Sequence, residues 1–436
     1  MNVHKAFEKF VANLRIEDTA TINSRYKTIT KLLNRKYWDS ESDTAHSLQV
    51  GSFGRGTATV GLSDLDMVMG LPWSVKTRFD EHEGNGQSAL LQEVKSAIKG
   101  TYPSTDVSGD GQVVVVKMTD FTIEVLPAFE NNDGSYVHAD TSDGGSWEDT
   151  NPRAEIAALN ELNKTTNGNL KHLCKMIRGW KNKSGTALPG ILIDTLCFNF
   201  FESQKKWHTE GYGSFDGLVA AFFEYLGDQD PKQKYWLAPG SRQRVYRKAS
   251  FVRKAKKAHS QCLNAIAKNE NISAADLWRE IFGSKFPTPA QLGDRSSTAK
   301  SLHRNTEEFI EDQVPVAIKH TLEIDCNVTQ AGFRTTRLAE MLMRRWPLLR
   351  GKSLRFFVTE CSVPEPYTIK WKVRNVGAKA ESLDKIRGEI HVDTGGKARS
   401  EQSQFNGPHY VECYVIQSGV CVARARIDVP IVSDDT

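Results

Sequence analysis

The chain has 436 residues, of which 39% are hydrophobic and 25% are charged. This composition is typical of globular proteins, and the length allows two or three domains that each bury a core. The formal net charge of +4 is too small to indicate duplex nucleic acid as the main partner, although it allows polyanionic ligands to bind at local basic patches.

Neither a membrane span nor a secretory signal is predicted. No apolar run is long enough to cross a bilayer, and the first ten residues lack the basic-then-apolar order of a signal peptide. The seven cysteines are scattered without CxxC pairs, which favours reduced core thiols over a zinc knuckle or a disulfide framework. We therefore expect a cytoplasmic protein without a membrane partner.

The N-terminal third is expected to combine helices with a small mixed sheet. Apolar residues at helical spacing over residues 3–37 predict two amphipathic helices or one broken helix, with Asp18 and Thr19 as a start signal for the second part. A polar, glycine-rich loop is expected over residues 54–63. Strands are predicted over residues 47–53, 64–71, 113–118 and 121–129.

The middle of the chain has a helical pattern, and the C-terminal part has mainly strand patterns. Helices are predicted over residues 154–164, 169–182, 191–204, 215–227 and 242–267. The polar segment around residues 288–305 has the composition of a linker. The strand patterns that follow are interrupted by one predicted helix over residues 335–346, and they indicate a separate β-rich module.

Two carboxylates stand one residue apart in the predicted strand over residues 64–71. Side chains alternate between the faces of a strand, so Asp64 and Asp66 share one face while the apolar residues between them point into a core. At a spacing of about 7 Å along one face the two charges repel each other unless a cation lies between them. Mg²⁺ prefers such oxygen ligands, together with substrate phosphates.

Two further features complete the predicted metal and phosphate site. Gly51 and Ser52 precede the Asp-x-Asp strand, and a glycine turn lets backbone N–H groups approach a phosphate closely. Two metal ions that hold an in-line displacement at phosphorus require another carboxylate from a neighbouring strand. Glu124 is the best candidate, because it lies on the polar face of an otherwise apolar strand, and Asp120 is the second choice.

Several segments resemble known nucleotidyltransferases. GSFGRGTATVGLSDLDMVM and IEVLPAF are similar to the signature of the superfamily related to DNA polymerase β, which has a Gly-Ser pair, an Asp-x-Asp strand and a later acid. NLKHLCKMIRGWK resembles the basic helix of the bacterial CD-NTases, which are relatives of cyclic GMP-AMP synthase and oligoadenylate synthase. TIKWKVRNVG and HYVECYVIQSG resemble the C-terminal sensor module (AGS-C-like) of some of these synthases.

The resemblance implies an α+β fold with a polymerase β-like palm, in which helices accompany a mixed sheet. A helical core domain and a separate β-rich C-terminal domain follow the palm. The expected boundaries are 1–150 for the palm with the N-terminal helices, 151–290 for the helical nucleotide-binding core, 291–309 for a linker and 310–436 for the sensor-like domain.

The resemblance also implies catalytic roles for the three acids. Asp64, Asp66 and Glu124 would hold two Mg²⁺ ions, with Mn²⁺ as an alternative, and relatives usually carry aspartate where Glu124 stands. Gly51 and Ser52 would contact the phosphates of a bound nucleotide.

A set of basic residues is assigned to the triphosphate by the same resemblance. Lys171, Lys175 and Arg178 recur at i, i+4 and i+7 and therefore lie on one side of a helix. The resemblance implies that this side faces the nucleotide. Without the resemblance, a charged helix face exposed to solvent explains the pattern equally well.

The implied activity is condensation of nucleoside triphosphates, with ATP as the expected substrate and GTP or others as alternatives. The product would be a cyclic or short linear oligonucleotide messenger in CBASS-type antiphage signalling, with a separate downstream effector and a regulatory protein or nucleic acid as further partners. Two alternatives stay open: an enzyme that adds nucleotides to RNA ends, and a catalytically silent nucleotide-sensing or binding protein.

The densest run of basic residues covers residues 241–259. Arg244, Arg247 and Lys248 are candidates for bordering the nucleotide pocket or binding a regulatory nucleic acid. One solvated side of a helix is the commoner explanation for such a run.

Overall fold

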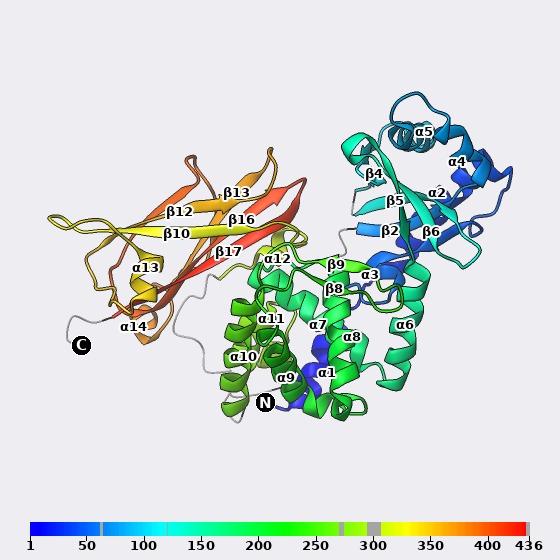
Figure 1. Cartoon of the computed structure of the whole chain (residues 1–436). Coiled ribbons are helices and arrows are strands. Elements are labelled where there is room, and N and C mark those ends of the chain that lie inside the picture. Colours follow the sequence, from blue (N-terminus) through cyan, green and yellow to red (C-terminus); the bar gives the residue numbers. More distant parts are fainter. Residues whose placement is uncertain (62–63, 120, 270–273, 294–306, 433–436) are drawn as a thin grey trace.

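The computed structural model describes residues 1–61, 64–119, 121–269, 274–293 and 307–432, and Figure 1 shows how they are arranged. A sheet covered by helices is followed by a group of helices, and a module of long strands comes last. Asp120, the second choice for the third acid, lies outside the described residues. The predicted α+β fold with a β-rich C-terminal part is confirmed.

The first part is built around a mixed sheet, in which seven strands are described. The central order is β1 (Ser47–Gln49), β2 (Asp64–Gly70), β5 (Thr122–Glu130), β4 (Val113–Lys117) and β3 (Asp106–Asp110), and β6 (Tyr136–Asp140) and β7 (Ser146–Thr150) extend it from β5. β2 and β5 run parallel to each other, whereas β1 and β4 pair with them in antiparallel fashion. The two strands that carry the predicted acids are therefore direct neighbours.

Helices cover one face of this sheet. They are α2 (Thr19–Trp38), α4 (Trp73–Asp80) and α5 (Gly86–Thr101). Ile29 of α2 and Val94 of α5 are buried against Leu65 and Ile123 of the strands, as the predicted alternation requires. The predicted start of α2 is confirmed, because the Asp18 side chain accepts a hydrogen bond from the Thr21 N–H at 2.9 Å. The opposite face is left for the acids.

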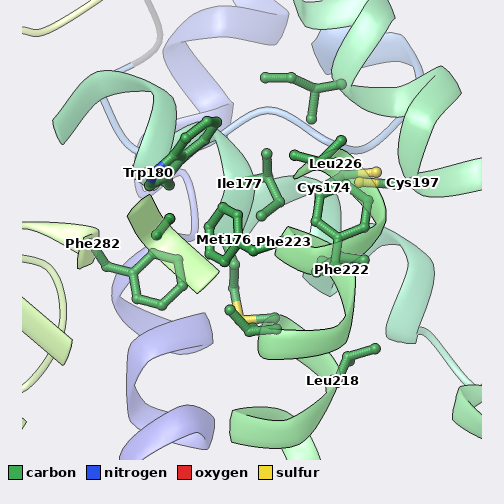
Figure 2. Packing of buried hydrophobic residues seen from close by; sticks show 14 of the residues in the cluster. Cys174, Met176, Ile177, Trp180, Cys197, Leu218, Phe222, Phe223, Leu226 and Phe282 are labelled. Atoms are coloured by element: carbon green, nitrogen blue, oxygen red, sulfur yellow. The ribbon is translucent and has the colours of Figure 1, made fainter. Parts of the chain in front are cut away.

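The second part of the structure is a group of helices that includes the N-terminal helix and the helices after the sheet. They are α1 (Val3–Asn13), α6 (Pro152–Thr165), α7 (Asn169–Ser184), α8 (Gly190–Ser203), α9 (Phe215–Gly227), α10 (Val252–Ala267) and α11 (Ala274–Phe282). Figure 2 shows part of their shared core, where Trp180 and Ile177 of α7 lie near Phe223 of α9 and Phe282 of α11. α1 packs here rather than on the sheet, because its buried Phe10 meets Phe282 with ring centroids 4.7 Å apart.

Two segments differ from their predicted structure. The strand predicted over residues 47–53 ends at Gln49, because Gly51 adopts a positive φ of 59° that does not continue a strand, and Gly51–Gly54 form the short helix α3. The helix predicted over residues 242–267 begins only at Val252. Before it, β9 (Arg244–Tyr246) pairs with β8 (Tyr235–Leu237). In β9, Val245 is buried between two exposed residues, which is the alternation of a strand. The many basic residues of this segment obscured that alternation in the sequence.

The C-terminal module is a pair of antiparallel sheets. β11 (Thr336–Arg337), β10 (Leu322–Thr329), β12 (Ser353–Cys361) and β15 (Ala398–Gln402) form one, and β14 (Ile390–Val392), β13 (Thr368–Arg374), β16 (Gly407–Gln417) and β17 (Val420–Ile431) form the other. Phe356 and Trp371 are buried between them. The predicted helix over residues 335–346 is shorter, since β11 takes its first residues and α13 (Leu338–Met343) follows.

A short segment connects α12 (Ile310–Gln313) to β10 and runs between the helices and the β-rich module. We call residues 314–320 the strap. Ala317 N–H and Lys319 N–H donate to the carbonyls of Cys421 and Val422 at 2.9 and 3.0 Å, so the strap is attached to β17. Figure 1 shows this junction close to α12 and the end of β17.

Two properties of the whole chain follow from the described elements. None of the helices in these ranges is both long and apolar enough to cross a bilayer. All seven cysteines are free thiols, and six of them are buried, as predicted.

Candidate active site

The parallel register of β2 and β5 brings the predicted acids together. Asp66 stands opposite Glu124, and Asp64 stands opposite Thr122. All three acidic side chains line a cavity of about 670 Å³ that lies between the sheet, α7 and the strap. Gly51 and Ser52 line the same cavity, so these five predicted residues meet at one place.

The electrostatics of the three acids call for a cation. Burial, followed by the charge of Asp64, raises the pKa of Asp66 to about 6. Burial and the charges of Asp64 and Asp66 raise the pKa of Glu124 to about 7. A dication between the three carboxylates would offset both the cost of burying their charges and their mutual repulsion. Carboxylate oxygens are also the ligands that Mg²⁺ or Mn²⁺ prefers.

The acids do not stand at coordinating positions around one point. In the described part of the chain, no group of three or more His, Cys, Asp or Glu side chains is arranged to hold a metal ion. Glu124 and Asp66 share a side-chain hydrogen bond, whereas Asp64 Oδ2 lies 2.8 Å from the ammonium of Lys319. The same ammonium is 3.9 Å from Glu124 Oε1. Small side-chain rotations are therefore needed before all three acids can bind one metal centre.

The Gly-Ser loop is held tightly against β2. Val50 N–H donates to the Asp66 carbonyl at 2.9 Å, and the Ser52 carbonyl accepts from Thr57 N–H and Ala58 N–H at 2.9 and 3.0 Å. A Cβ atom at Gly51 would overlap the Asp66 carboxylate, so only glycine allows the loop to approach the acid this closely.

Arg178 lines the cavity, but its charge is already used within the protein. Its guanidinium binds Asp194 of α8 through two hydrogen bonds of 2.7 and 2.9 Å. Arg55 Nε and Thr57 Oγ1 bind the same carboxylate at 2.9 and 3.0 Å. Burial disfavours the Asp194 charge, yet the two arginines outweigh burial and lower its pKa to about 2. This buried network fixes the Gly-Ser loop region to α7 and α8.

The two predicted lysines of α7 lie away from the cavity, and a third lysine takes their expected place. Neither Lys171 nor Lys175 is among the lining residues, and Lys171 Nζ donates to Asn160 Oδ1 at 2.6 Å. Lys181 does line the cavity. It follows Arg178 by three residues, so its position on the same side of the helix was a signal in the sequence that was missed.

Lys248 is the second lysine of the cavity wall. It lies in the loop after β9, which agrees with the prediction that the basic run borders the pocket. Arg244 and Arg247 do not line the cavity: Arg244 stacks over the ring of Tyr235, and Arg247 donates to the Pro231 carbonyl at 2.6 Å.

These two lysines are available to bind a ligand of the cavity. Among the described residues, neither Lys181 nor Lys248 forms a side-chain ion pair. Burial, followed by repulsion from Arg178 and Lys319, lowers the pKa of Lys181 to about 7. Lysine ammonium groups without acidic partners favour an anionic ligand such as a phosphate.

A Gly-Ser loop, an Asp-x-Asp strand and an acid on the neighbouring parallel strand face a helical part across one cavity, which is the arrangement that the resemblance to nucleotidyltransferases predicts. Residues 1–163 match the Second Messenger Oligonucleotide or Dinucleotide Synthetase domain (SMODS). Residues 304–432 match the Adenylyl/Guanylyl and SMODS C-terminal sensor domain (AGS_C). The chain therefore combines a SMODS domain with a C-terminal sensor domain, which confirms the resemblance to the CD-NTases.

Two curated relatives are similar to this chain. A cyclic AMP-AMP-GMP synthase of Enterobacter hormaechei subsp. hoffmannii is 28% identical over 163 residues, which cover 34% of this chain and 42% of the relative. A cyclic AMP-AMP-AMP synthase of an Acinetobacter species is 24% identical over 285 residues, which cover 60% of this chain and 78% of the relative. The chain spans less than two thirds of the length of three of the curated relatives that it matches, at 63%, 42% and 43%.

A solved structure has the same fold over most of its length. CdnC of E. coli MS115-1, determined with ATP, is 14% identical and aligns over 65% of this chain and 98% of its own, with a TM-score of 0.51. This likeness supports the arrangement of the sheet and the helical part.

Proposed function

We propose that this protein is a divalent-cation-dependent nucleotidyltransferase that condenses nucleoside triphosphates into a cyclic or short linear oligonucleotide. The observation that carries the proposal is the meeting of Asp64, Asp66 and Glu124 with the Gly-Ser loop in one cavity that also contains two unpaired lysines. Acids and free cations in one cavity suit a ligand that brings both a metal ion and phosphates.

In the proposed reaction, a ribose hydroxyl attacks the α-phosphate of a bound triphosphate. A new P–O bond forms, the bond to pyrophosphate breaks, and the hydroxyl proton passes to a carboxylate or water. Asp64, Asp66 and Glu124 would hold two Mg²⁺ ions, or Mn²⁺, and these ions supply charge neutralisation at the reacting phosphate when bound.

The remaining residues of the cavity bind and orient the nucleotide. The backbone at Gly51 and Ser52 lies open to a phosphate, and Lys181 and Lys248 would neutralise the triphosphate and the departing pyrophosphate. Arg178 acts through Asp194, because it keeps the loop region and α8 in place rather than binding phosphate itself.

The proposal includes a substrate class and partners. ATP is the expected substrate, with GTP as an alternative, because the relatives described above are synthases of cyclic AMP-AMP-GMP and cyclic AMP-AMP-AMP. CdnC has been solved in complex with a HORMA protein, which supports a regulatory protein as a partner. A separate effector, a role in CBASS-type antiphage signalling and a cytoplasmic location, which suits seven free thiols, belong to the same proposal.

Purified protein incubated with labelled nucleoside triphosphates and Mg²⁺, without RNA, tests the proposal against terminal nucleotide addition. We expect small phosphatase-resistant products and released pyrophosphate in the absence of any primer. Label that appears only on added RNA would instead identify an RNA-terminal nucleotide-adding enzyme.

The role of the third acid can be tested by substituting Glu124 with glutamine. Glu124→Gln is expected to lower kcat about 100-fold or more, because a neutral amide removes a charged metal ligand worth several kcal/mol. Steady-state kinetics of pyrophosphate release measures the effect. Asp120→Asn is the matched comparison, and a larger loss in that variant would move the third ligand to Asp120.

The structure and the helix pattern make different predictions for the lysines of α7. Lys181→Met is expected to raise the KM for the nucleoside triphosphate about 10-fold, since a charge-assisted hydrogen bond contributes roughly 1.5–3 kcal/mol. Lys175→Met is the control on the same helix and is expected to leave KM nearly unchanged. A larger effect at Lys175 than at Lys181 would restore the assignment made from the sequence.

A further inference from the structure

The active-site cavity contains one cation that comes from the C-terminal part of the chain. Lys319 projects from the strap, and its ammonium lies 2.8 Å from Asp64 Oδ2 and 3.9 Å from Glu124 Oε1. Asp64 and Glu124 come from adjacent strands of the first sheet. A residue of the linking segment to the sensor module thus binds two of the three acids that are proposed to hold the catalytic metal.

The backbone that carries Lys319 is fixed from two sides. On one side, β17 accepts hydrogen bonds from Ala317 N–H and Lys319 N–H. On the other side, the Asn182 side chain of α7 donates to the Val316 carbonyl at 2.9 Å and accepts from Ile318 N–H at 3.4 Å. The position of the ammonium is therefore set by how the sensor module sits on α7, and not by a freely moving loop.

The contact between the sensor module and α7 is ionic. Glu412 of β16 binds Arg424 of β17 at 2.8 Å and lies 3.7 Å from Lys183 of α7, and Arg424 is 3.7 Å from Glu311 of α12. Glu412 and Arg424 are buried, so their pairing offsets a large desolvation cost and contributes little net stability. Interfaces of this polar kind are typical of modules that change their relative position.

Space for such a movement exists behind the strap. A second cavity of about 340 Å³ is lined by strap residues, by Lys183 of α7 and by Phe282 of α11. It shares Asn182 and Val316 with the active-site cavity, so the strap separates the two cavities. Withdrawal of the strap toward the second cavity would take Lys319 away from Asp64.

We propose that Lys319 is an internal cation through which the C-terminal sensor module holds the catalytic acids and opposes metal binding. A dication between these acids would repel an ammonium that lies 2.8 Å from one of them, so metal binding and retention of Lys319 oppose each other. By linkage, whatever releases the strap strengthens metal binding, and metal binding loosens the strap by the same factor. This inference rests on the proposed function only in assuming that Asp64, Asp66 and Glu124 bind divalent cations.

Mn²⁺ binding to the full chain without nucleotide, measured by electron paramagnetic resonance, tests the inference directly. Lys319→Met keeps most of the side-chain volume but removes the charge, and it is expected to bind Mn²⁺ about 10-fold more tightly than the parent protein, a factor that corresponds to about 1.4 kcal/mol. Lys379→Met removes a charge from an exposed position of the same module and is expected to have no effect. Equal Mn²⁺ affinities in the parent protein and Lys319→Met would overturn the inference.

One further variant separates failure of the inference from failure of the proposed function. Adding Asp64→Asn and Asp66→Asn to Lys319→Met is expected to abolish the Mn²⁺ site. If that triple variant still binds Mn²⁺ as Lys319→Met does, the proposed metal site itself is wrong. If the site is lost but Lys319→Met and the parent protein had equal affinities, only the role of Lys319 is wrong.

Hydrogen exchange of the strap amides distinguishes this inference from a role of Lys319 as a phosphate ligand. A phosphate ligand would not make exchange depend on Mn²⁺ in the absence of nucleotide. The amides of Ala317 and Lys319 are bonded to β17, and we expect their exchange to become about 10-fold faster in the parent protein when Mn²⁺ binds. Slower or unchanged exchange, combined with weakened nucleotide binding in Lys319→Met, would show that Lys319 is a phosphate ligand instead.

Discussion

Replacing Asp64 and Asp66 together by asparagine is expected to lower nucleotidyl transfer at least about a thousandfold, which corresponds to about 4 kcal/mol of transition-state stabilisation. Both acids lie on the polar face of β2, and Asp66 stands opposite Glu124 in the neighbouring strand. Asparagine keeps their size but cannot neutralise a dication. Pyrophosphate release and product formation from labelled ATP measure the loss.

The fold of this double variant is expected to survive. Burial and the charge of Asp64 raise the pKa of Asp66, so ionisation of Asp66 costs folding free energy at neutral pH, and removing that charge relieves the cost. An unchanged circular dichroism spectrum would show that lost activity reflects lost chemistry. If turnover survives in a folded variant, the metal assignment is wrong.

Removing the carboxylate of Asp194 is expected to have the largest effect on stability. Asp194→Ala should lower the free energy of unfolding by about 3–5 kcal/mol, because it leaves two buried guanidinium groups without their anion. Those groups belong to Arg178 and Arg55, which bind the carboxylate at 2.7–2.9 Å. Chemical denaturation of the parent protein and the variant measures the difference.

An exposed ion pair provides the control for this prediction. Asp428 lies 2.6 Å from Lys257, and the two side chains are 44% and 56% exposed. Solvent screens such a pair, so Asp428→Ala is expected to cost less than about 1 kcal/mol. Equal losses in the two variants would contradict the structural role given to the buried network around Asp194.

Patterns within each strand predicted the strand faces on which the structure has the three acids. The period of two placed Asp64 and Asp66 opposite the apolar face of β2, and Glu124 opposite the apolar face of β5, because an exposed sheet face tolerates the charges that the core excludes. The pairing of β2 with β5 was not readable from either strand alone. It depends on the register between segments about 60 residues apart in the sequence.

Helix periodicity could not predict which basic residues line the cavity, because it gives a side of the helix but not the surroundings of that side. Lys171, Lys175 and Arg178 share one side of α7, yet Arg178 is bound by Asp194 and the two lysines lie outside the cavity. Which part of that side meets the sheet depends on how α7 packs on its neighbours. Lys181, a further turn along, is the residue that reaches the cavity.

Lys319 had no local signal at all. Its segment has neither the strand period nor the glycine and acid pattern of the catalytic part, and it reaches Asp64 only because β17 and Asn182 hold the strap between two modules. Contacts between residues this far apart in sequence are fixed by tertiary packing, which one sequence does not reveal.

Crystals soaked with Mn²⁺ and a non-hydrolysable nucleoside triphosphate give the most direct test of the central claim. The anomalous signal of Mn²⁺ is expected between Asp64, Asp66 and Glu124, at coordination distances of roughly 2.1 Å and next to the triphosphate, with Lys319 moved away from Asp64. Manganese bound elsewhere, with the three acids unchanged and a triphosphate outside the cavity, would contradict the account.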